Sequence, residues 1–213
     1  MSKLRYRYED RFAEAGKDAP EERKELLDYF DKKIRPKWDE LKTDGVGRES
    51  DNQLVYHVCY DCNMKVWRGI YDRVKNIAEK CEVYIDWEQI KHVIRFTFLG
   101  QPPGGFFMPH VNMNLLALSA FNIPLKGKTE IALFKDDVTE LTRHEYKNPC
   151  FLNVNKPHGV FNDEPTERLI LKTHMTVVPW EQLVSHYEQG KRFKLFDNGV
   201  PWSQDDHDAN KRW

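Results

Sequence analysis

The chain has 213 residues, and its 33 lysine and arginine residues nearly balance its 34 aspartate and glutamate residues, which gives a formal net charge of −1. This length is sufficient to bury one sizeable core, so we expect residues 1–213 to form a single domain, and the balanced charge provides no footprint for nucleic acid or an anionic membrane. Because the sequence has neither a long apolar run nor an apolar segment near Met1, we expect no membrane span and no signal peptide, and we predict a cytoplasmic protein.

The first part of the chain, residues 1–50, is predicted to form an N-terminal arm and one helix. Residues 1–18 are charged and carry scattered aromatic side chains, which is typical of a mobile or loosely docked arm. From Pro20, two glutamates and then apolar residues at helical spacing predict an amphipathic helix that Pro36 ends or kinks. The glycine-containing segment 43–52 is predicted to be a loop.

The middle part, residues 54–178, is predicted to be a β-rich core with one inserted helix at 63–80, where apolar residues recur with helical period. Short runs rich in β-branched and aromatic residues mark the strands. The predicted strands are 54–60, 82–87, 91–99, 115–125, 129–134, 150–154 and 168–178. The charged segment 138–147 is expected to be a loop or a hairpin.

Two of these strands alternate clearly enough to predict their faces. Strand 91–99 is expected to have one buried and one solvated face. In strand 168–178, a face with basic side chains is formed by Arg168, Ile170, Lys172 and His174. Lys172 and His174 therefore either line a pocket or simply pack within the protein.

The last part, residues 179–213, is predicted to be a helix beginning near Pro179 and a polar tail that is either disordered or covers the core. Helices at the two ends and short strands between them indicate an α+β protein. Its core is expected to be a jelly-roll barrel built of two sheets, with flanking helices.

The second half of the chain carries two histidines, a side-chain oxygen and an arginine in a suggestive order. His110 is followed two residues later by Asn112, and His158 is followed ten residues later by Arg168. Two imidazoles and an oxygen ligand on one side of iron(II) leave positions open for a co-substrate and dioxygen. A buried guanidinium suits a carboxylate better than an ammonium group does.

These residues lie in the segments Pro-His-Val-Asn (109–112), Lys-Pro-His-Gly-Val-Phe-Asn (156–162) and Arg-Leu-Ile-Leu (168–171). The arrangement resembles the iron(II)/2-oxoglutarate-dependent dioxygenases, in particular the branch that contains aspartyl/asparaginyl β-hydroxylase and the free-proline hydroxylases. The resemblance covers about residues 100 to 180, and its specificity lies in the joint order and spacing of the motifs rather than in any one of them.

The resemblance implies a double-stranded β-helix, or cupin-like, core. It implies His110 and His158 as ligands of Fe(II) and Arg168 as the residue that binds the far carboxylate of 2-oxoglutarate. It also implies an oxidoreductase that hydroxylates an unactivated C–H bond of a small molecule or of an amino-acid or peptidyl substrate, releasing succinate and CO2. Which substrate it takes and how many chains associate are not implied.

Asn112 departs from the family pattern, in which many members have aspartate at this position. A neutral amide oxygen is a poorer ligand for a divalent cation than a carboxylate. Four outcomes follow: Asn112 ligates the metal weakly, water takes the position, an anion such as chloride takes it as in related halogenases, or the site binds no metal. In the last case the protein is a non-catalytic cupin-like binding module.

Other candidate residues have plainer interpretations. Cys59 and Cys62 form a C-x-x-C pair, for which zinc binding or redox chemistry is the alternative to buried or idle thiols. His57 lies in a predicted strand and is expected to be structural. Gly159 is expected to let the chain approach a ligand closely. Large aromatic side chains expected in the core rather than at a substrate are Trp67, Trp87 and Phe107.

Overall fold

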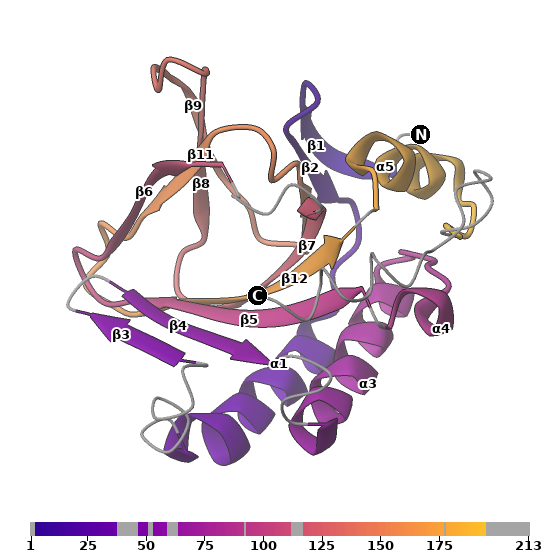
Figure 1. Cartoon of the computed structure of the whole chain (residues 1–213), viewed down its shortest axis with the longest axis horizontal. Helices are drawn as coiled ribbons and strands as arrows, with labels where there is room; N and C mark the ends of the chain where they lie inside the picture. The colour runs from indigo at the N-terminus through magenta and orange to yellow at the C-terminus, as the bar shows by residue number, and fades with distance from the viewer. Residues whose placement is uncertain are drawn as a thin grey trace.

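The computed structural model describes residues 3–37, 47–50, 53–58, 64–91, 93–111, 117–176 and 178–194. Within these residues the chain forms two antiparallel sheets that face each other, with helices packed outside them (Figure 1). The larger sheet contains, in spatial order, β1 (Leu4–Tyr8), β2 (Phe12–Ala15), β10 (Cys150–Leu152), β7 (Ala117–Lys126), β12 (Arg168–Thr176), β5 (Ile94–Gln101), β4 (Gln53–Val58) and β3 (Gly47–Ser50). The smaller sheet contains β6 (Phe106–His110), β11 (His158–Phe161), β8 (Glu130–Phe134) and β9 (Glu140–Glu145).

The order of the strands along the chain defines the architecture. From β5 to β12 the chain passes back and forth between the sheets, and only β8 and β9 are consecutive in the same sheet. Every recorded strand pairing in the two sheets is antiparallel. This is the winding of a jelly roll, so the predicted α+β class with a cupin-like double-stranded β-helix is confirmed.

Helices cover the outer face of the larger sheet. They are α1 (Pro20–Tyr29), which continues as a π-helical turn η1 (Phe30–Ile34) and a 3-10 turn η2 (Arg35–Lys37), and α3 (Met64–Lys80). Figure 1 shows α1 and α3 beneath the larger sheet, α4 (Trp87–Ile90) near the upper end of α3, and α5 (Trp180–Gln189) near β1 and β2. The regular α-helix ends before Pro36, as predicted. No helix in the described ranges is long and apolar enough to span a membrane.

Aromatic side chains join these helices to the sheet. The ring centroids of Phe30 and Phe98 are 4.4 Å apart, and those of Trp67 and Phe96 are 5.8 Å apart. Phe30, Phe96 and Phe98 are each 0% exposed. Burying such a side chain stabilises the folded state by roughly 1.5–3 kcal/mol, so this aromatic layer contributes substantially to the stability of the fold. It also holds the strands whose opposite face bears the candidate site.

The expectation of a loose N-terminal arm is wrong. Residues 4–15 form the β1–β2 hairpin, and β2 pairs with β10 at the edge of the larger sheet. Phe12 and Ala13 are 0% exposed. Arg5 and Arg7 on β1 are exposed, whereas all four residues of β2 are buried, including the charged Glu14. The charge of the segment therefore concealed its docking in the sequence.

Two local predictions also need correction. Residues 82–87 are not a strand: Asp86 caps the short helix α4 by accepting a hydrogen bond from the Gln89 backbone N–H at 3.4 Å. Part of the predicted loop 43–52 is strand β3, which pairs with β4. Short elements of this kind are decided by capping and pairing partners, which a local pattern does not contain.

The second face of β5 is not solvated as predicted. Arg95, Thr97 and Leu99 point toward the smaller sheet, and Thr97 is only 1% exposed. Alternation correctly separated the two faces of the strand. The alternation did not reveal that the smaller sheet covers the polar face of β5.

Candidate functional site

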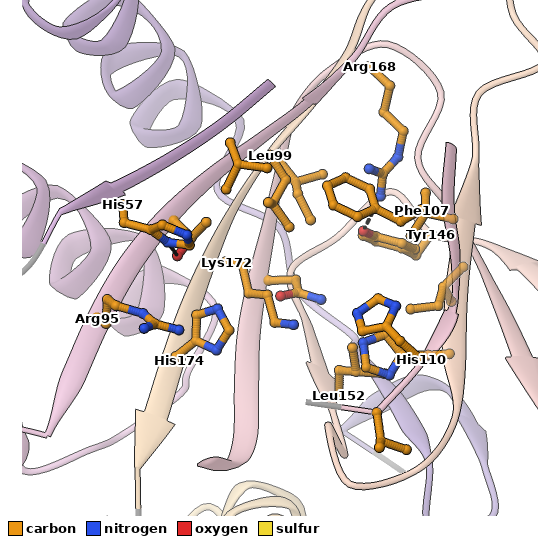
Figure 2. Close-up of a pocket in the computed structure, with 18 residues that line it drawn as sticks. His57, Arg95, Leu99, Phe107, His110, Tyr146, Leu152, Arg168, Lys172 and His174 are labelled. Atoms are coloured by element: carbon orange, nitrogen blue, oxygen red, sulfur yellow. Dashed lines mark hydrogen bonds between the residues drawn. The ribbon is translucent and has the colours of Figure 1, made fainter. Parts of the chain in front are cut away.

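A cavity of about 440 Å³ lies between the two sheets. Side chains of both sheets line it, and Figure 2 shows them pointing toward one another from opposite walls. The described lining residues include two arginines, one lysine and four histidines, and no aspartate or glutamate is among them. The cavity is therefore a basic site with largely apolar walls.

His110 and His158 meet on the smaller sheet. They are paired residues of the antiparallel strands β6 and β11, and their ring centroids are 4.5 Å apart with an interplanar angle of 51°. His158 is 3% exposed, whereas His110 is solvent-accessible at the edge of the cavity. Gly159 packs closely against β6, since a Cβ there would lie 3.1 Å from the Phe107 carbonyl oxygen. The expected approach of Gly159 to a ligand stays a prediction.

The tautomer of each ring follows from its hydrogen bond. His110 Nδ1 lies 2.8 Å from the Met108 carbonyl oxygen, and His158 Nδ1 lies 2.9 Å from the Lys156 carbonyl oxygen. A carbonyl oxygen only accepts, so each Nδ1 carries the proton and each Nε2 keeps a lone pair. The buried His158 Nε2 has no hydrogen-bond partner. Nδ1–H bonded to a backbone carbonyl is the usual arrangement of a metal-binding histidine.

Desolvation favours the neutral form of both rings, because it lowers the pKa of each imidazole. It lowers the pKa of His158 well below the ordinary value, and the nearby charge of Lys172 lowers it further. Desolvation also lowers the pKa of His110; the hydrogen bond to the Met108 carbonyl oxygen raises it in part, and the charge of Lys172 lowers it. A neutral imidazole is the form that ligates a metal.

Arg168 lies at the start of β12 and is 1% exposed. Its Nη1 donates to Gln101 Oε1 at 2.7 Å, and its Nη2 donates to Tyr146 Oη at 3.1 Å. Both partners are neutral, and Arg168 Nε is buried without a hydrogen-bond partner. Because the hydrogen bonds of this buried guanidinium within the described residues go to neutral groups, the arrangement suits a ligand carboxylate.

The structure brings three of the four predicted site residues, His110, His158 and Arg168, to one cavity. Asn112 lies outside the described residues, so its predicted role at the metal is an expectation from sequence. Within the described ranges no three His, Cys, Asp or Glu side chains are grouped to hold a metal ion. The residues present fit a metal with two protein nitrogens, and they leave its other positions to Asn112, water or co-substrate.

The predictions for the cysteine pair and for three aromatic residues have different outcomes. Cys59 and Cys62 also lie outside the described residues, so the zinc or redox alternative is untested. Trp67 and Trp87 are core residues, each 3% exposed, as predicted. Phe107 instead lines the cavity.

Several residues of the cavity were not identified from sequence. His57, expected to be structural, lines the cavity, and its Nδ1 lies 2.8 Å from Thr97 Oγ1. Gln101 is opposite Arg168 in the β5–β12 register, and Tyr146 reaches Arg168 from the end of the predicted charged segment 138–147. Knowledge of the strand register would have indicated Gln101. Nothing in the local sequence indicates Tyr146.

Comparisons with known proteins concern the fold. No protein-family model and no curated protein sequence matches the chain. Among solved structures, a Pseudomonas putida prolyl-4-hydroxylase is 12% identical over 78% of this chain and 92% of its own, with a TM-score of 0.46. A Bacillus subtilis oxalate decarboxylase variant is 15% identical over 62% of this chain and 28% of its own, with a TM-score of 0.42.

A third similar structure is hazelnut (Corylus avellana) vicilin, 8% identical over 60% of this chain, with a TM-score of 0.38. The chain spans 30% of the vicilin chain and 28% of the oxalate decarboxylase chain. Identities and scores this low carry no functional argument. The fold class rests on the strand order described above.

Proposed function

We propose that the cavity is the active site of an Fe(II)- and 2-oxoglutarate-dependent oxygenase that hydroxylates a small molecule or an amino-acid or peptidyl substrate. One observation supports this most: the two Nε2 lone pairs of His110 and His158, each set by a carbonyl bond on Nδ1, lie in the same cavity as the buried Arg168. The sequence resemblance assigns the same three residues to iron and 2-oxoglutarate.

Each residue has a defined task in this proposal. His110 and His158 hold Fe(II) through Nε2, and Asn112, water or an anion completes the protein side of the site. Arg168 binds the far carboxylate of 2-oxoglutarate, with Gln101 and Tyr146 keeping its guanidinium in place through the bonds that they accept. The apolar lining excludes water from the reacting groups.

When bound, the iron and its co-substrate supply the oxidation of an unactivated C–H bond. In the overall balance, substrate R–H, 2-oxoglutarate and O2 give R–OH, succinate and CO2. One oxygen atom enters the substrate and the other enters succinate. The protein contributes orientation and a dry cavity.

The test is the weak visible charge-transfer band that forms when Fe(II) and 2-oxoglutarate are added to the protein without oxygen. We expect the band in the parent protein and its loss in His110→Ala. His186→Ala is the matched control, because His186 lies on α5, outside the cavity lining, and bonds the Gln182 carbonyl oxygen. A succinate-release screen against amino acids, peptides and other small molecules then identifies the substrate.

A non-catalytic binding module is the second candidate. It is favoured by the observation that the described part of the chain offers no third His, Cys, Asp or Glu at the two histidines. If the parent protein shows no charge-transfer band, yet a small molecule raises its melting temperature, the binding-module hypothesis is preferred to the oxygenase hypothesis.

A further inference from the structure

The cavity contains a buried hydrogen-bond acceptor that the proposed roles of iron and 2-oxoglutarate do not use. It is the amide oxygen of Asn122 on β7, a residue that lines the cavity and is 2% exposed. This oxygen, Oδ1, has no hydrogen-bond partner. A buried polar atom that has lost water and gained no partner destabilises the protein, so a ligand that donates to Oδ1 would be favoured.

Strand register fixes where Asn122 lies. It is paired with Cys150 of β10 on one side and with Lys172 of β12 on the other. Lys172 and His174 both line the cavity, which is the first of the two outcomes that the sequence left open for them. Directly opposed residues of antiparallel strands have Cβ atoms about 4.5–5.5 Å apart, so Asn122 and Lys172 are neighbours on the cavity wall.

The neighbour on the β10 side orients the amide group of Asn122. Burial raises the pKa of the Cys150 thiol well above its ordinary value, and a hydrogen bond from Asn122 lowers this pKa in part. Because Oδ1 has no partner, the group that makes this bond is the amide N–H of Asn122, which donates to the sulfur. The nitrogen is thereby occupied, and the oxygen is left as the acceptor for a ligand.

Asn122 lies on the wall opposite the histidine pair. Its strand β7 belongs to the larger sheet, whereas β6 and β11, which carry His110 and His158, belong to the smaller sheet. The charge of Lys172 lowers the pKa of both imidazoles, so the wall around Lys172 and Asn122 is near the pair. Figure 2 shows the Lys172 side chain extending toward His110. A molecule bonded to Asn122 Oδ1 therefore lies between the sheets, on the side of the cavity that the histidines face.

The surroundings of Oδ1 define the chemistry of its ligand. An amide oxygen only accepts, so the ligand must offer an N–H or an O–H group. A neutral donor suits this neutral oxygen, because burying a charged donor costs far more. Apolar side chains that line the cavity include Ile131, Leu152 and Ile170, which suit a hydrocarbon body. The volume of about 440 Å³ suits a small molecule, since such sites measure about 300–1,000 Å³.

We propose that Asn122 Oδ1 binds the neutral hydrogen-bond donor, an amide N–H or a hydroxyl group, of a small molecule whose apolar body lies in the cavity. As a binding site this stands on the cavity and its unpartnered oxygen. As the substrate site it rests on the proposed oxygenase function. Asn122 is then a specificity-determining residue, and the molecule that it binds is hydroxylated on its hydrocarbon part, with the balance given above.

The experiment is calorimetric titration of the full chain, without iron or 2-oxoglutarate, using two pairs of probes that are alike in shape and differ in the donor. Benzamide is compared with acetophenone, and benzyl alcohol is compared with anisole. We expect at least one donor probe to bind about tenfold more tightly than its partner, because the partner leaves Oδ1 buried and unpaired. The pair that shows the preference distinguishes an amide ligand from an alcohol.

Asn122→Leu should remove this preference, because it replaces the acceptor by an apolar group of similar size. Asn76→Leu is the matched control and should retain the preference, since Asn76 is exposed on α3 and lies outside the cavity lining. Asn122→Ala provides a second removal of the acceptor if Asn122→Leu does not fold, as judged by circular dichroism.

The proposal is overturned if neither donor probe binds more tightly than its partner, which includes the case in which no probe binds. It is also overturned if the preference persists in Asn122→Leu or Asn122→Ala, because the donor then bonds another atom. Tighter binding of benzylammonium than of both neutral donors overturns it as well, because the site then selects a charged group.

This proposal and the proposed function fail separately. A donor preference that depends on Asn122, without the charge-transfer band, leaves a binding module for neutral donors. The band without the donor preference leaves an oxygenase whose substrate does not use Asn122.

Discussion

His158 is paired with His110 across strands β11 and β6, and the two rings approach to 4.5 Å between centroids. Two neutral imidazoles at this distance, each with Nδ1 bonded to a carbonyl, present their Nε2 atoms within one cavity. One of these atoms is buried without a partner, which costs about 1–3 kcal/mol in the absence of a ligand.

Replacing His158 tests the buried half of the pair. His158→Ala removes one of two protein nitrogens, so we expect Fe(II) affinity to fall more than about 100-fold in anaerobic titrations. The metal-free variant also loses the Nδ1–H bond to Lys156 and gains a cavity, so its free energy of unfolding should fall by about 1–3 kcal/mol. Unchanged iron affinity in this variant, with His186→Ala as control, contradicts ligation by His158.

Replacing Tyr146 tests the Arg168 site. Tyr146→Phe removes the acceptor of one guanidinium hydrogen bond, whose net value is about 1 kcal/mol. We expect 2-oxoglutarate to bind the iron-loaded protein about fivefold more weakly, while Arg168→Met abolishes its binding. Tyr71→Phe is the matched control, because Tyr71 is a core tyrosine that bonds Glu88 instead. Full 2-oxoglutarate affinity in Arg168→Met would place the co-substrate elsewhere.

Asn112 is tested by restoring a carboxylate. We expect Asn112→Asp to preserve or tighten Fe(II) binding, because a carboxylate adds a negative charge beside the cation. The measurement is the same anaerobic titration. A large loss of iron affinity would mean that residue 112 is not at the metal.

Lys172 predicts a pH-dependent stability. Its pKa is about 7 in the folded protein and about 10.4 in an unfolded chain, so between these values the unfolded state binds the extra proton. The free energy of unfolding contributed by this group therefore rises with pH from about 7 to about 10. Below pH 7 Lys172 is protonated in both states, so its contribution to the free energy of unfolding no longer changes with pH.

We accordingly expect Lys172→Met to be more stable than the parent near pH 6, by an amount on the order of a few kcal/mol, and this advantage to shrink toward pH 9. Urea unfolding of both proteins across this range is the measurement. Cysteine and tyrosine titrations are common to the two proteins and cancel in the difference. A difference that stays constant with pH would argue that Lys172 keeps an ordinary pKa.

The N-terminal hairpin is expected to stabilise the whole sheet. Phe12 is 0% exposed, and its ring centroid is 5.6 Å from that of Tyr146, which bonds Arg168. Phe12→Ala should lower the free energy of unfolding by about 3–5 kcal/mol. Arg7→Ala, which removes an exposed ion pair with Glu188, should cost about 1 kcal/mol or less. If both substitutions lower the free energy of unfolding by the same small amount, residues 4–15 do not stabilise the sheet.

The periodicity of apolar residues in the sequence predicted several of the helices and strands. The helices at 64–80 and 180–189 and the strands at 130–134 and 168–176 agree with the predicted segments to within a few residues, because each has a strong local pattern. The errors fall on short or charged segments. Two segments that were not predicted as strands pair at the edges of the larger sheet: the hairpin within Leu4–Ala15, and Gly47–Ser50.

The order and spacing of three short motifs, through their resemblance to the iron(II)/2-oxoglutarate-dependent dioxygenases, were enough to single out His110, His158 and Arg168. Only the tertiary structure decided that Gln101 and Tyr146 hold Arg168 and that His57 and Arg95 join Lys172 and His174. The reason is that alternation along a strand separates its two faces, whereas the contents of a cavity depend on which strands become neighbours and which sheet closes over them.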